Sequence, residues 1–240
     1  MVNAHHFQLY DHLLQFQLFQ GLSRTELLQL AGNTKFGFTK QPAARLVAKA
    51  DEACTQLLFL VSGRLSLVSQ SADGGYTVEE QLSAPWLLQP EALFGASPRY
   101  THTVRTLQES HFITLSKEEV LRLADDFLTV RLNLLNLLTT LAQRRALMPW
   151  RRTPQSLRER VVRFIVDHCV YPAGHKELRI LMRRLPDELG CKRLDVSKTL
   201  NELQADALIQ LHRGRIEIPL LEHLLSTSTN PIHPKTTADK

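Results

Sequence analysis

The chain has 240 residues, of which 43% are hydrophobic and 22% are charged. That length and composition allow a buried core and more than one domain of ordinary size. The sequence shows neither a run of about eighteen apolar residues nor a basic-then-apolar N-terminus, which argues against a membrane span and a secretory signal. Its three cysteines lie far apart and fit no disulfide or metal-ligand spacing, so we expect a cytoplasmic protein with no metal and no cofactor.

The net charge of +5 is unevenly placed. Residues 1–150 carry 13 Lys and Arg against 13 Asp and Glu, whereas residues 151–240 carry 16 against 11. A basic module behind a neutral one indicates that the second module meets a polyanion. The alternative is that the surplus is scattered over solvated faces.

The N-terminal half changes from helix to strand patterns. Apolar spacing predicts a helix over residues 7–31, in which Ser23 and Glu26 have the spacing of a capping box. Short β-type segments follow up to residue 116, and Asp73-Gly74-Gly75 predicts a hairpin turn. The predicted strands are 36–38, 45–48, 56–61, 64–69, 76–81, 102–107 and 112–116. Short strands at this spacing predict a β-barrel or roll.

A long helix is predicted over residues 117–148, with apolar residues at a nearly heptad spacing. One face can dock on the roll while another pairs with a second copy of the chain. A helix wholly buried in its own chain is the alternative, but three heptads exceed what a small roll needs. The predicted dimerisation residues are Phe127, Val130, Leu134, Leu137 and Leu141.

A domain boundary is predicted at residues 149–153, because Pro149 ends the long helix. Thr153 is expected to cap the next helix, with Pro154 at its first position. Further elements are a strand at 178–182, a helical turn at 185–189, a tight turn at Gly190-Cys191, a helix at 192–207 and a hairpin of 208–211 with 215–218. Val196, Leu200, Leu203 and Ala207 form the expected core face of the second helix. This order predicts a winged helix-turn-helix, with a disordered tail from Ser226 onwards.

The order of roll, long helix and winged helix resembles the Crp/Fnr family of bacterial transcription regulators. The sharpest match is the segment from Gly190 to Leu200, GCKRLDVSKTL, against the family pattern G-C/V-S-R-E-T-V-G/S-R-x-L. The segment APWLL at residues 84–88 also resembles the enterobacterial regulators named as inhibitors of hydrogen peroxide resistance. The resemblance implies an α+β fold with a cyclic-nucleotide-binding-like roll at 1–116, a dimerisation helix at 117–148, a DNA-binding domain at 149–225 and a tail at 226–240.

The resemblance also implies duplex DNA, a second copy of the chain and RNA polymerase as partners. In the family the second helix of the motif enters the major groove, and Arg193 matches a base-reading arginine that can hold two guanine acceptors. Leu194 stands where the family has glutamate, so the DNA sequence read should differ. Lys192 replaces the usual capping serine. The predicted DNA-binding residues are Lys192, Arg193, Leu194, Ser197, Lys198, Arg213 and Arg215.

The family's cyclic-nucleotide cassette, G-E-x-x-L-F followed by R-S/T-A, is degraded in this chain. Alignment puts Pro90 at the glutamate position and Tyr100 at the arginine position, while Glu91 and Arg99 each lie one residue away. A shift of one residue on a strand turns a side chain to the opposite face. We therefore expect no cyclic AMP binding, and either another ligand or a structural role for the roll. The candidate effector residues are Glu91, Arg99, Tyr100 and Thr101.

Other functional hypotheses fit the residues less well. No cysteine precedes Cys54, so an N-terminal iron–sulfur cluster is not expected. Cys54, in a polar loop, is expected to be inert, and a redox-active thiol is the alternative. The sequence lacks a nucleophile–base pair, a phosphate loop and an H-E-x-x-H motif, which argues against an enzyme. A sensor module that acts mainly through protein contacts stays open beside the DNA-binding regulator.

Overall fold

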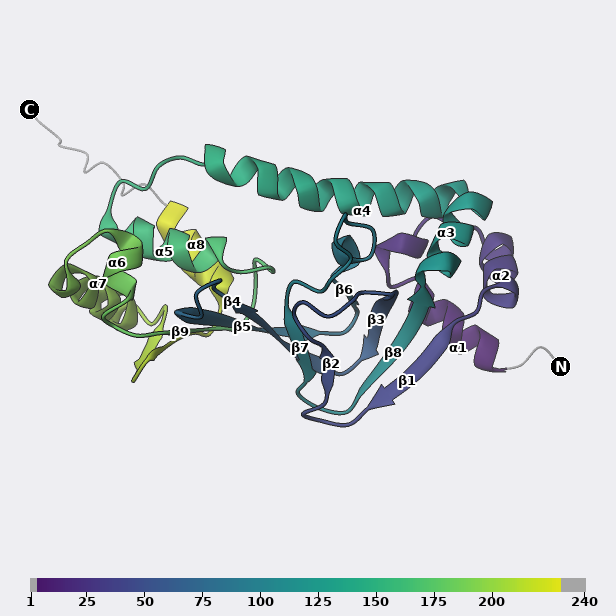
Figure 1. Cartoon of the computed structure of the whole chain (residues 1–240), viewed down its shortest axis with the longest axis horizontal. Coiled ribbons are helices and arrows are strands. Elements are labelled where there is room, and N and C mark those ends of the chain that lie inside the picture. The colour runs from purple at the N-terminus through teal and green to yellow at the C-terminus, as the bar shows by residue number, and fades with distance from the viewer. Residues whose placement is uncertain (1–3, 230–240) are drawn as a thin grey trace, which may run out of the picture. The chain divides into compact units, whose positions relative to one another are not determined.

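The computed structural model describes the backbone of residues 4–229 and the side chains of residues 9–226. It divides into two compact units, a roll unit of residues 1–68 and 81–151 and a C-terminal unit of residues 69–80 and 152–240 (Figure 1). The sequence-based division placed residues 69–80 in the roll domain. The structure differs because this hairpin tip pairs with a strand of the C-terminal unit.

The roll unit begins with three helical pieces, α1 (Ala4–Leu13), the 3-10 turn η1 (Gln17–Phe19) and α2 (Arg24–Asn33). The prediction of one helix over 7–31 is wrong, since α1 ends at Leu13 and Gly21, with a φ of 81°, lies between η1 and α2. The capping box is confirmed: the Glu26 amide donates to Ser23 Oγ at 3.2 Å, and the Ser23 amide donates to the Glu26 carboxylate at 2.7 Å.

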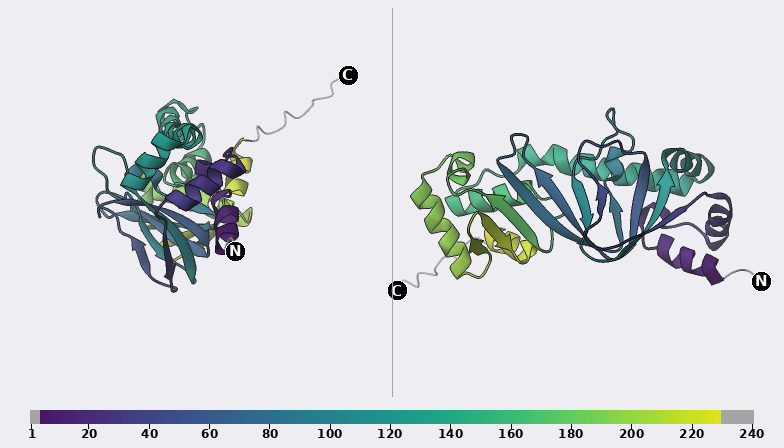
Figure 2. Two further views of the ribbon diagram at one scale, coloured as in Figure 1. Left: turned by 90° about the vertical axis from the view of Figure 1, so that its right-hand side faces the viewer. Right: turned by 60° about the horizontal axis from the view of Figure 1, so that its bottom comes forward.

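Antiparallel strands form the roll (Figure 2). One sheet has the order β1-β8-β3-β6, and β2-β7-β4 form the other side. The seven predicted strands are confirmed, and β6, which follows Pro85, is an addition. Gly63 joins β3 to β4 with a φ of 111°, and a Cβ there would lie 2.8 Å from the Ser110 backbone. The bounds are β1 (Gly37–Gln41), β2 (Leu46–Ala48), β3 (Gln56–Ser62), β4 (Arg64–Gln70), β5 (Tyr76–Ser83), β6 (Trp86–Leu88), β7 (Thr103–Thr106) and β8 (Ser110–Ser116).

The predicted long helix is two helices, α3 (Lys117–Asp126) and α4 (Leu128–Leu147), followed by the 3-10 turn η3 (Met148–Trp150). Phe127 separates them in an extended conformation and is buried. Val130 and Leu134 are also buried in the core of the roll unit, so the assignment of Phe127, Val130 and Leu134 to a dimer seam is corrected. Leu137 and Leu141 are half-buried. The freely exposed face of α4 is a different one, and it carries Leu128, Leu132 and Leu135.

The C-terminal unit contains α5 (Leu157–Asp167), β9 (Lys176–Ile180), α6 (Leu185–Leu189), α7 (Arg193–Ala205), β10 (Gln210–His212), β11 (Arg215–Ile218) and α8 (Leu221–Thr229). Ser156, not Thr153, caps α5 by accepting a hydrogen bond from the Glu159 amide. Ala207 lies beyond α7, exposed and with a φ of 58°, so it is not a core residue. Because α8 extends to Thr229, the tail predicted from Ser226 begins too early, and its remainder lies outside the described residues.

The hairpin tip of β4 and β5 supplies a strand to the sheet of the C-terminal unit. Residues Tyr76–Glu80 pair with β9 from Ile180 to Lys176 in an antiparallel register, and β11 and β10 follow on the other side of β9. At the end of this register the Glu80 carboxylate lies 2.8 Å from Lys176 Nζ, with both side chains fully buried. Backbone amides of Val170 and Tyr171 donate to the same carboxylate at 2.7 and 3.0 Å.

Candidate nucleic-acid interface

A tight turn joins α6 to α7. Gly190 ends α6 with a φ of 61°, and its amide donates to the Asp187 carbonyl. The Cys191 amide donates to Pro186 O at 3.0 Å, and Arg160 from α5 donates to Leu189 O at 3.3 Å. Glycine suits this left-handed position because it lacks a Cβ. These bonds fix the angle between the two helices.

Helix α7 has a fully buried side and an exposed side. Val196, Leu200 and Leu203 are buried in the core that α5 shares. Lys192, Arg193 and Lys198 are exposed, and Leu194 has 83% of its surface exposed. The predicted buried and exposed faces of the helix are therefore confirmed, except at Ala207. Ser197 is half-buried and lines a small cavity with Leu211 and Gly214 of the β10–β11 hairpin, so it stands apart from the exposed set.

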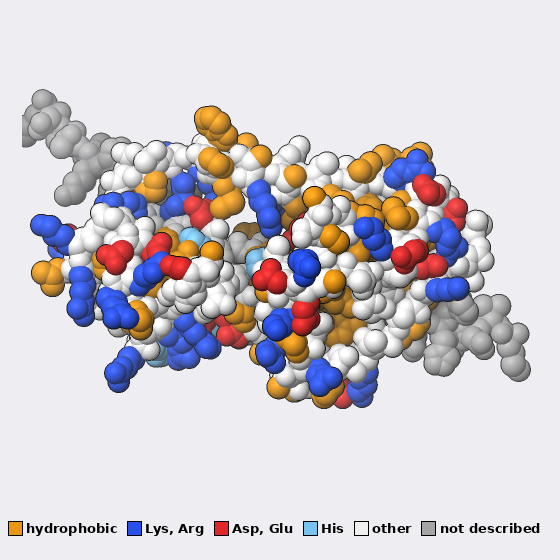
Figure 3. All heavy atoms as spheres, viewed as in Figure 1, with side chains coloured by type: hydrophobic (Ala, Val, Ile, Leu, Met, Phe, Trp, Pro, Cys, Tyr) orange, Lys and Arg blue, Asp and Glu red, His pale blue; other side chains and the backbone are white. Residues whose placement is uncertain are grey.

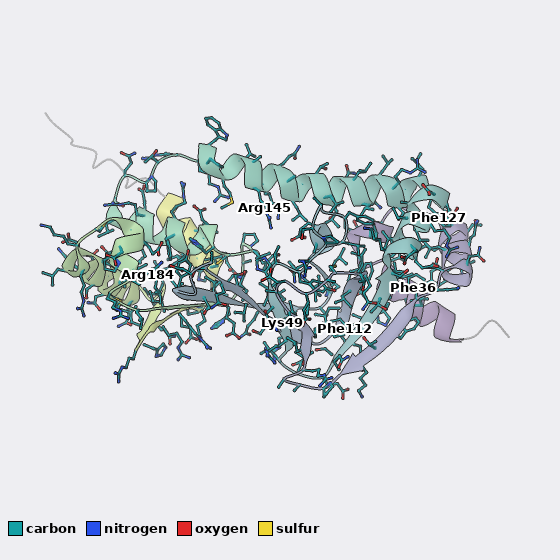
Figure 4. All side chains as sticks on the ribbon, in the orientation of Figure 1. Phe36, Lys49, Phe112, Phe127, Arg145 and Arg184 are labelled. Atoms are coloured by element: carbon teal, nitrogen blue, oxygen red, sulfur yellow. The ribbon has the colours of Figure 1, made fainter. Side chains whose placement is uncertain are left out.

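The cations of this unit fall into paired and unpaired groups. Arg215 Nη1 donates to Glu177 at 3.1 Å, and Arg179 donates to the same carboxylate at 2.5 Å. Arg184, labelled in Figure 4, is paired with Asp73 and Glu188. An arginine already held by a carboxylate offers less to a phosphate, so Arg215 is a weaker candidate than the sequence suggested.

Within the described residues, four exposed cations of the α6–α7–hairpin region have no carboxylate within 4.0 Å. Lys192, Arg193 and Lys198 lie on or next to α7, and Arg213 lies in the turn of the hairpin. Figure 3 shows blue side chains gathered over this part of the C-terminal unit. Arg183, between β9 and α6, is likewise exposed and unpaired, although it is not among the predicted DNA-binding residues. The only feature of the sequence that could have indicated Arg183 is the pair of adjacent arginines, Arg183 and Arg184. In the structure Arg184 is paired with carboxylates and Arg183 is not.

Helix α7 lacks a side-chain cap. Lys192 occupies the N-cap position with extended dihedrals and makes no side-chain cap hydrogen bond, as the sequence predicted. Asp195 in the first turn is the acidic group that complements the helix dipole there. Serine or threonine would add a capping bond, and lysine adds a charge at this end of the exposed face.

The effector cassette region of the roll is organised around Gln89. This residue is 5% exposed and has a φ of 38°. Its Oε1 accepts hydrogen bonds from the Thr101 amide, the Thr101 hydroxyl and the His102 amide at 2.9, 3.0 and 3.0 Å. Its Nε2 donates to His102 O at 3.1 Å. A glutamine of the chain itself therefore satisfies the backbone amides that follow the degraded arginine position.

The four candidate effector residues do not converge on one site. Arg99 is exposed and donates to the Asp51 carbonyl at 2.5 Å. Glu91 lies 3.8 Å from Arg145 of α4, a residue labelled in Figure 4. Tyr100 is buried beside Cys54, and burial raises the pKa of Tyr100 well above its ordinary value. Thr101 is exposed and held by Gln89.

Cys54 is buried, with 4% of its surface exposed, and not a surface thiol as its polar neighbours suggested. Its Sγ lies 3.7 Å from the Gln56 carbonyl, and burial raises the pKa of the thiol. A raised pKa disfavours the reactive thiolate. Among the described residues there is no cluster of three metal-ligating side chains, and none of the helices described is long and apolar enough to cross a membrane.

The roll has a recognisable family likeness. Residues 39–127 match the family model of the cyclic nucleotide-binding domain. This match runs from within β1 to the end of α3 and Phe127, and it agrees with the antiparallel roll. No curated protein matches the chain.

Several solved structures to which the chain is similar are named as bacterial transcription regulators. The sensor domain of the regulator DNR from Pseudomonas aeruginosa aligns with a TM-score of 0.51 at 20% identity, over 64% of this chain and 99% of that one. The catabolite activator protein of Thermus thermophilus aligns with a TM-score of 0.49 at 20% identity, over 89% and 98%. A Crp/Fnr-family regulator from Eubacterium rectale aligns at 0.48 and 18% identity, over 90% and 99%. The DNR likeness supports the fold of the cyclic-nucleotide-binding-like roll.

Proposed function

We propose that this protein is a cytoplasmic transcription regulator of the Crp/Fnr type that binds specific sites in double-stranded DNA as a homodimer, with RNA polymerase as a further partner. The observation that carries the proposal is the exposed face of α7. Its cations Arg193 and Lys198 have no carboxylate partner among the described residues, while the opposite face is locked into the core. In this reading α6, α7 and the β10–β11 hairpin are a winged helix-turn-helix.

The roles follow from the chemistry of each side chain. Arg193 is placed to donate two hydrogen bonds to the O6 and N7 atoms of a guanine, which discriminates by about 1–3 kcal/mol against other bases. Leu194 is a large apolar side chain in water, and contact with a thymine methyl would remove that surface from solvent. Lys192, Lys198, Arg183 and Arg213 would hold phosphates, which position the helix without reading sequence.

The dimer in this proposal uses the exposed stripe of α4 and not the residues named from the sequence. Leu128, Leu132 and Leu135 are spaced by four and three residues and are 64%, 50% and 52% exposed. Continuing that spacing gives Thr139, Ala142 and Ala146, which are small and also exposed. A seam of this spacing suits two-stranded packing. Paired helices would present two copies of α7 to half-sites about one helical turn apart.

The roll in this proposal does not take cyclic AMP. The support is Gln89, which already supplies the acceptor for the amides of Thr101 and His102. No arginine enters that position, because Arg99 faces the Asp51 carbonyl. The finer resemblance of residues 84–88 to regulators of hydrogen peroxide resistance stays a prediction.

The test is selection of DNA from a random duplex pool by the full-length protein, followed by fluorescence anisotropy on the selected duplex. Arg193→Ala should weaken binding to the selected site about tenfold or more and change binding to scrambled DNA much less. Arg179→Ala is the matched control. It also removes one positive charge, but Arg179 is already paired with Glu177, so this variant should retain the affinity for the selected duplex. If no DNA binds near physiological salt, the protein is instead a sensor module that acts through protein contacts.

A further inference from the structure

A cavity of about 900 Å³ opens in the roll unit, away from the Gln89 region. Its walls come from α1, α2, the segment between α2 and β1, and strands β1, β3 and β8. None of its lining residues belongs to the effector cassette at 89–102. The volume lies in the range of pockets that hold small organic ligands, about 300–1,000 Å³.

The body of the cavity is aromatic and aliphatic. Phe36, Phe38 and Phe112 line it together with Val61 and Ile113. Figure 4 labels Phe36, which lies just before β1, and Phe112 on β8. Phe38, which lines the cavity, is 65% exposed, so an apolar ligand would remove its ring from water. Apolar surface of this kind favours a hydrocarbon or aromatic ligand body.

Two residues that line the same cavity each carry a buried polar atom without a hydrogen-bond partner in the described structure. The atoms are Nδ1 of His12 on α1 and Oγ1 of Thr34 after α2. An unsatisfied buried polar group destabilises the folded state. A ligand with an oxygen atom in their reach would satisfy both, since a hydroxyl and an imidazole N–H can each donate to an oxygen.

The charged residues that line the cavity are all basic. Lys35 has no carboxylate within 4.0 Å in the described structure, whereas Lys40 Nζ lies 2.8 Å from Glu109. Glu119 is already engaged by Arg122 and by the Lys35 backbone amide. No aspartate or glutamate is among the described lining residues. The cavity therefore favours an anionic head group over a cationic one.

We propose that this cavity binds a small amphipathic carboxylate. Its hydrocarbon body lies between Phe36, Phe38 and Phe112, and its carboxylate accepts hydrogen bonds from Thr34 Oγ1 and His12 Nδ1 and pairs with Lys35. A carboxylate offers four acceptor positions, enough for three donors. This inference does not depend on DNA binding.

The experiment is isothermal titration calorimetry of the full-length protein with decanoate, below its micelle range. Decyltrimethylammonium has the same chain length and the opposite charge, and butyrate has the same head group with too short a body. Decanoate should bind with a stoichiometry of one per chain, and both comparison compounds should bind at least about tenfold more weakly. Equal binding of decyltrimethylammonium, or no saturable heat with decanoate up to about 1 mM, would overturn the proposal.

Variants locate the site. Thr34→Val removes one hydroxyl at nearly constant shape and should weaken decanoate binding about threefold to tenfold, as should Lys35→Gln. Phe38→Asp puts a carboxylate at an exposed position of the wall and should abolish binding without unfolding the chain. Leu121→Asp on α3, a 48% exposed leucine outside the cavity, is the control and should bind as the parent does. Equal loss in Leu121→Asp, or full binding by Phe38→Asp, would place decanoate elsewhere and overturn the assignment.

Discussion

Gln89 Oε1 accepts a hydrogen bond of 2.9 Å from the backbone amide of Thr101. The bond crosses between two segments that, in the cyclic-nucleotide cassette the sequence resembles, would meet at the ligand's phosphate. Here the neutral side chain of Gln89 connects the two segments by accepting hydrogen bonds from the amides of Thr101 and His102. The backbone of Gln89 has left-handed dihedrals. At this point the roll is thus held together by an internal acceptor.

This arrangement predicts that Gln89→Ala destabilises the protein without creating a cyclic AMP site. Removal of the side chain leaves the Thr101 and His102 amides without their acceptor, at a cost of about 1–3 kcal/mol in the free energy of unfolding. Urea denaturation measures the loss, with Gln108→Ala on the surface as the control. Cyclic AMP at micromolar concentration should leave the melting temperature of both parent and variant unchanged, and an upward shift of several degrees would contradict this account of the cassette.

The two leucine faces of α4 predict opposite outcomes for the same substitution. Leu132→Glu combined with Leu135→Glu places charges on exposed positions, so the chain should stay folded and sediment as a monomer. Leu134→Glu buries a charge in the roll core and should unfold the roll unit. Analytical ultracentrifugation with circular dichroism distinguishes the cases. Leu121→Glu on α3 should leave the sedimentation coefficient unchanged, and a dimer that persists in Leu132→Glu/Leu135→Glu would exclude this seam.

Lys198 and Arg193 should affect DNA binding in different ways. Lys198 is an exposed point charge, and its replacement by alanine should weaken binding to the selected and the scrambled duplex by the same factor. The slope of log affinity against log salt should then fall by about 1, since one phosphate contact releases about one counterion. Arg193→Ala should instead reduce the preference for the selected site. A titration series from low to physiological salt separates the two effects, and an unchanged slope for Lys198→Ala would remove it from the phosphate contacts.

Local patterns were sufficient for much of the fold. Strand alternation located the roll strands, and the spacing of Val196, Leu200 and Leu203 gave the buried face of α7, because each signal lies within one element. The assignment of Phe127, Val130 and Leu134 to the dimer face was wrong because they are buried in the roll unit. Helix α4 carries leucines on several sides. Periodicity alone cannot say which of them the roll buries, and Leu134 and Leu135 are adjacent in sequence but differ in exposure, 8% against 52%.

The site was less predictable where its chemistry depends on distant residues. The pairing of Arg215 with Glu177 arises from neighbouring strands 38 residues apart, and that of Arg184 with Asp73 spans 111 residues. Neither could be derived from spacing. The role of Gln89 depends on its contact with residues 101 and 102 through a turn that no local signal specifies. The cationic residues were therefore identifiable from the sequence, but their availability was not.

Asp73 should contribute stability that is lost only at strongly acidic pH. A hydrogen bond from the Gly75 amide, with further bonds from Ser71 and Arg184, lowers the pKa of Asp73 from 3.8 to about 2. Because the folded-state pKa is depressed, the contribution is fully present above pH 3.8 and disappears as the pH falls through about 2. Asp73→Asn should therefore lower the melting temperature at pH 6 and differ little from the parent near pH 2. An equal deficit at both pH values would show that the charge is not responsible.

Lys176 and Glu80 should be strongly coupled in a double-mutant cycle. Both side chains are fully buried, so Lys176→Met leaves a buried carboxylate that keeps only the Val170 and Tyr171 amides as partners. We expect a loss of about 3 kcal/mol or more in unfolding free energy. Glu80→Gln in the same background removes the unpaired charge and should recover part of that loss, although Glu80→Gln alone destabilises the protein because it leaves the ammonium unpaired. Urea denaturation of the four proteins provides the cycle, and strictly additive effects would show that the two groups do not depend on one another.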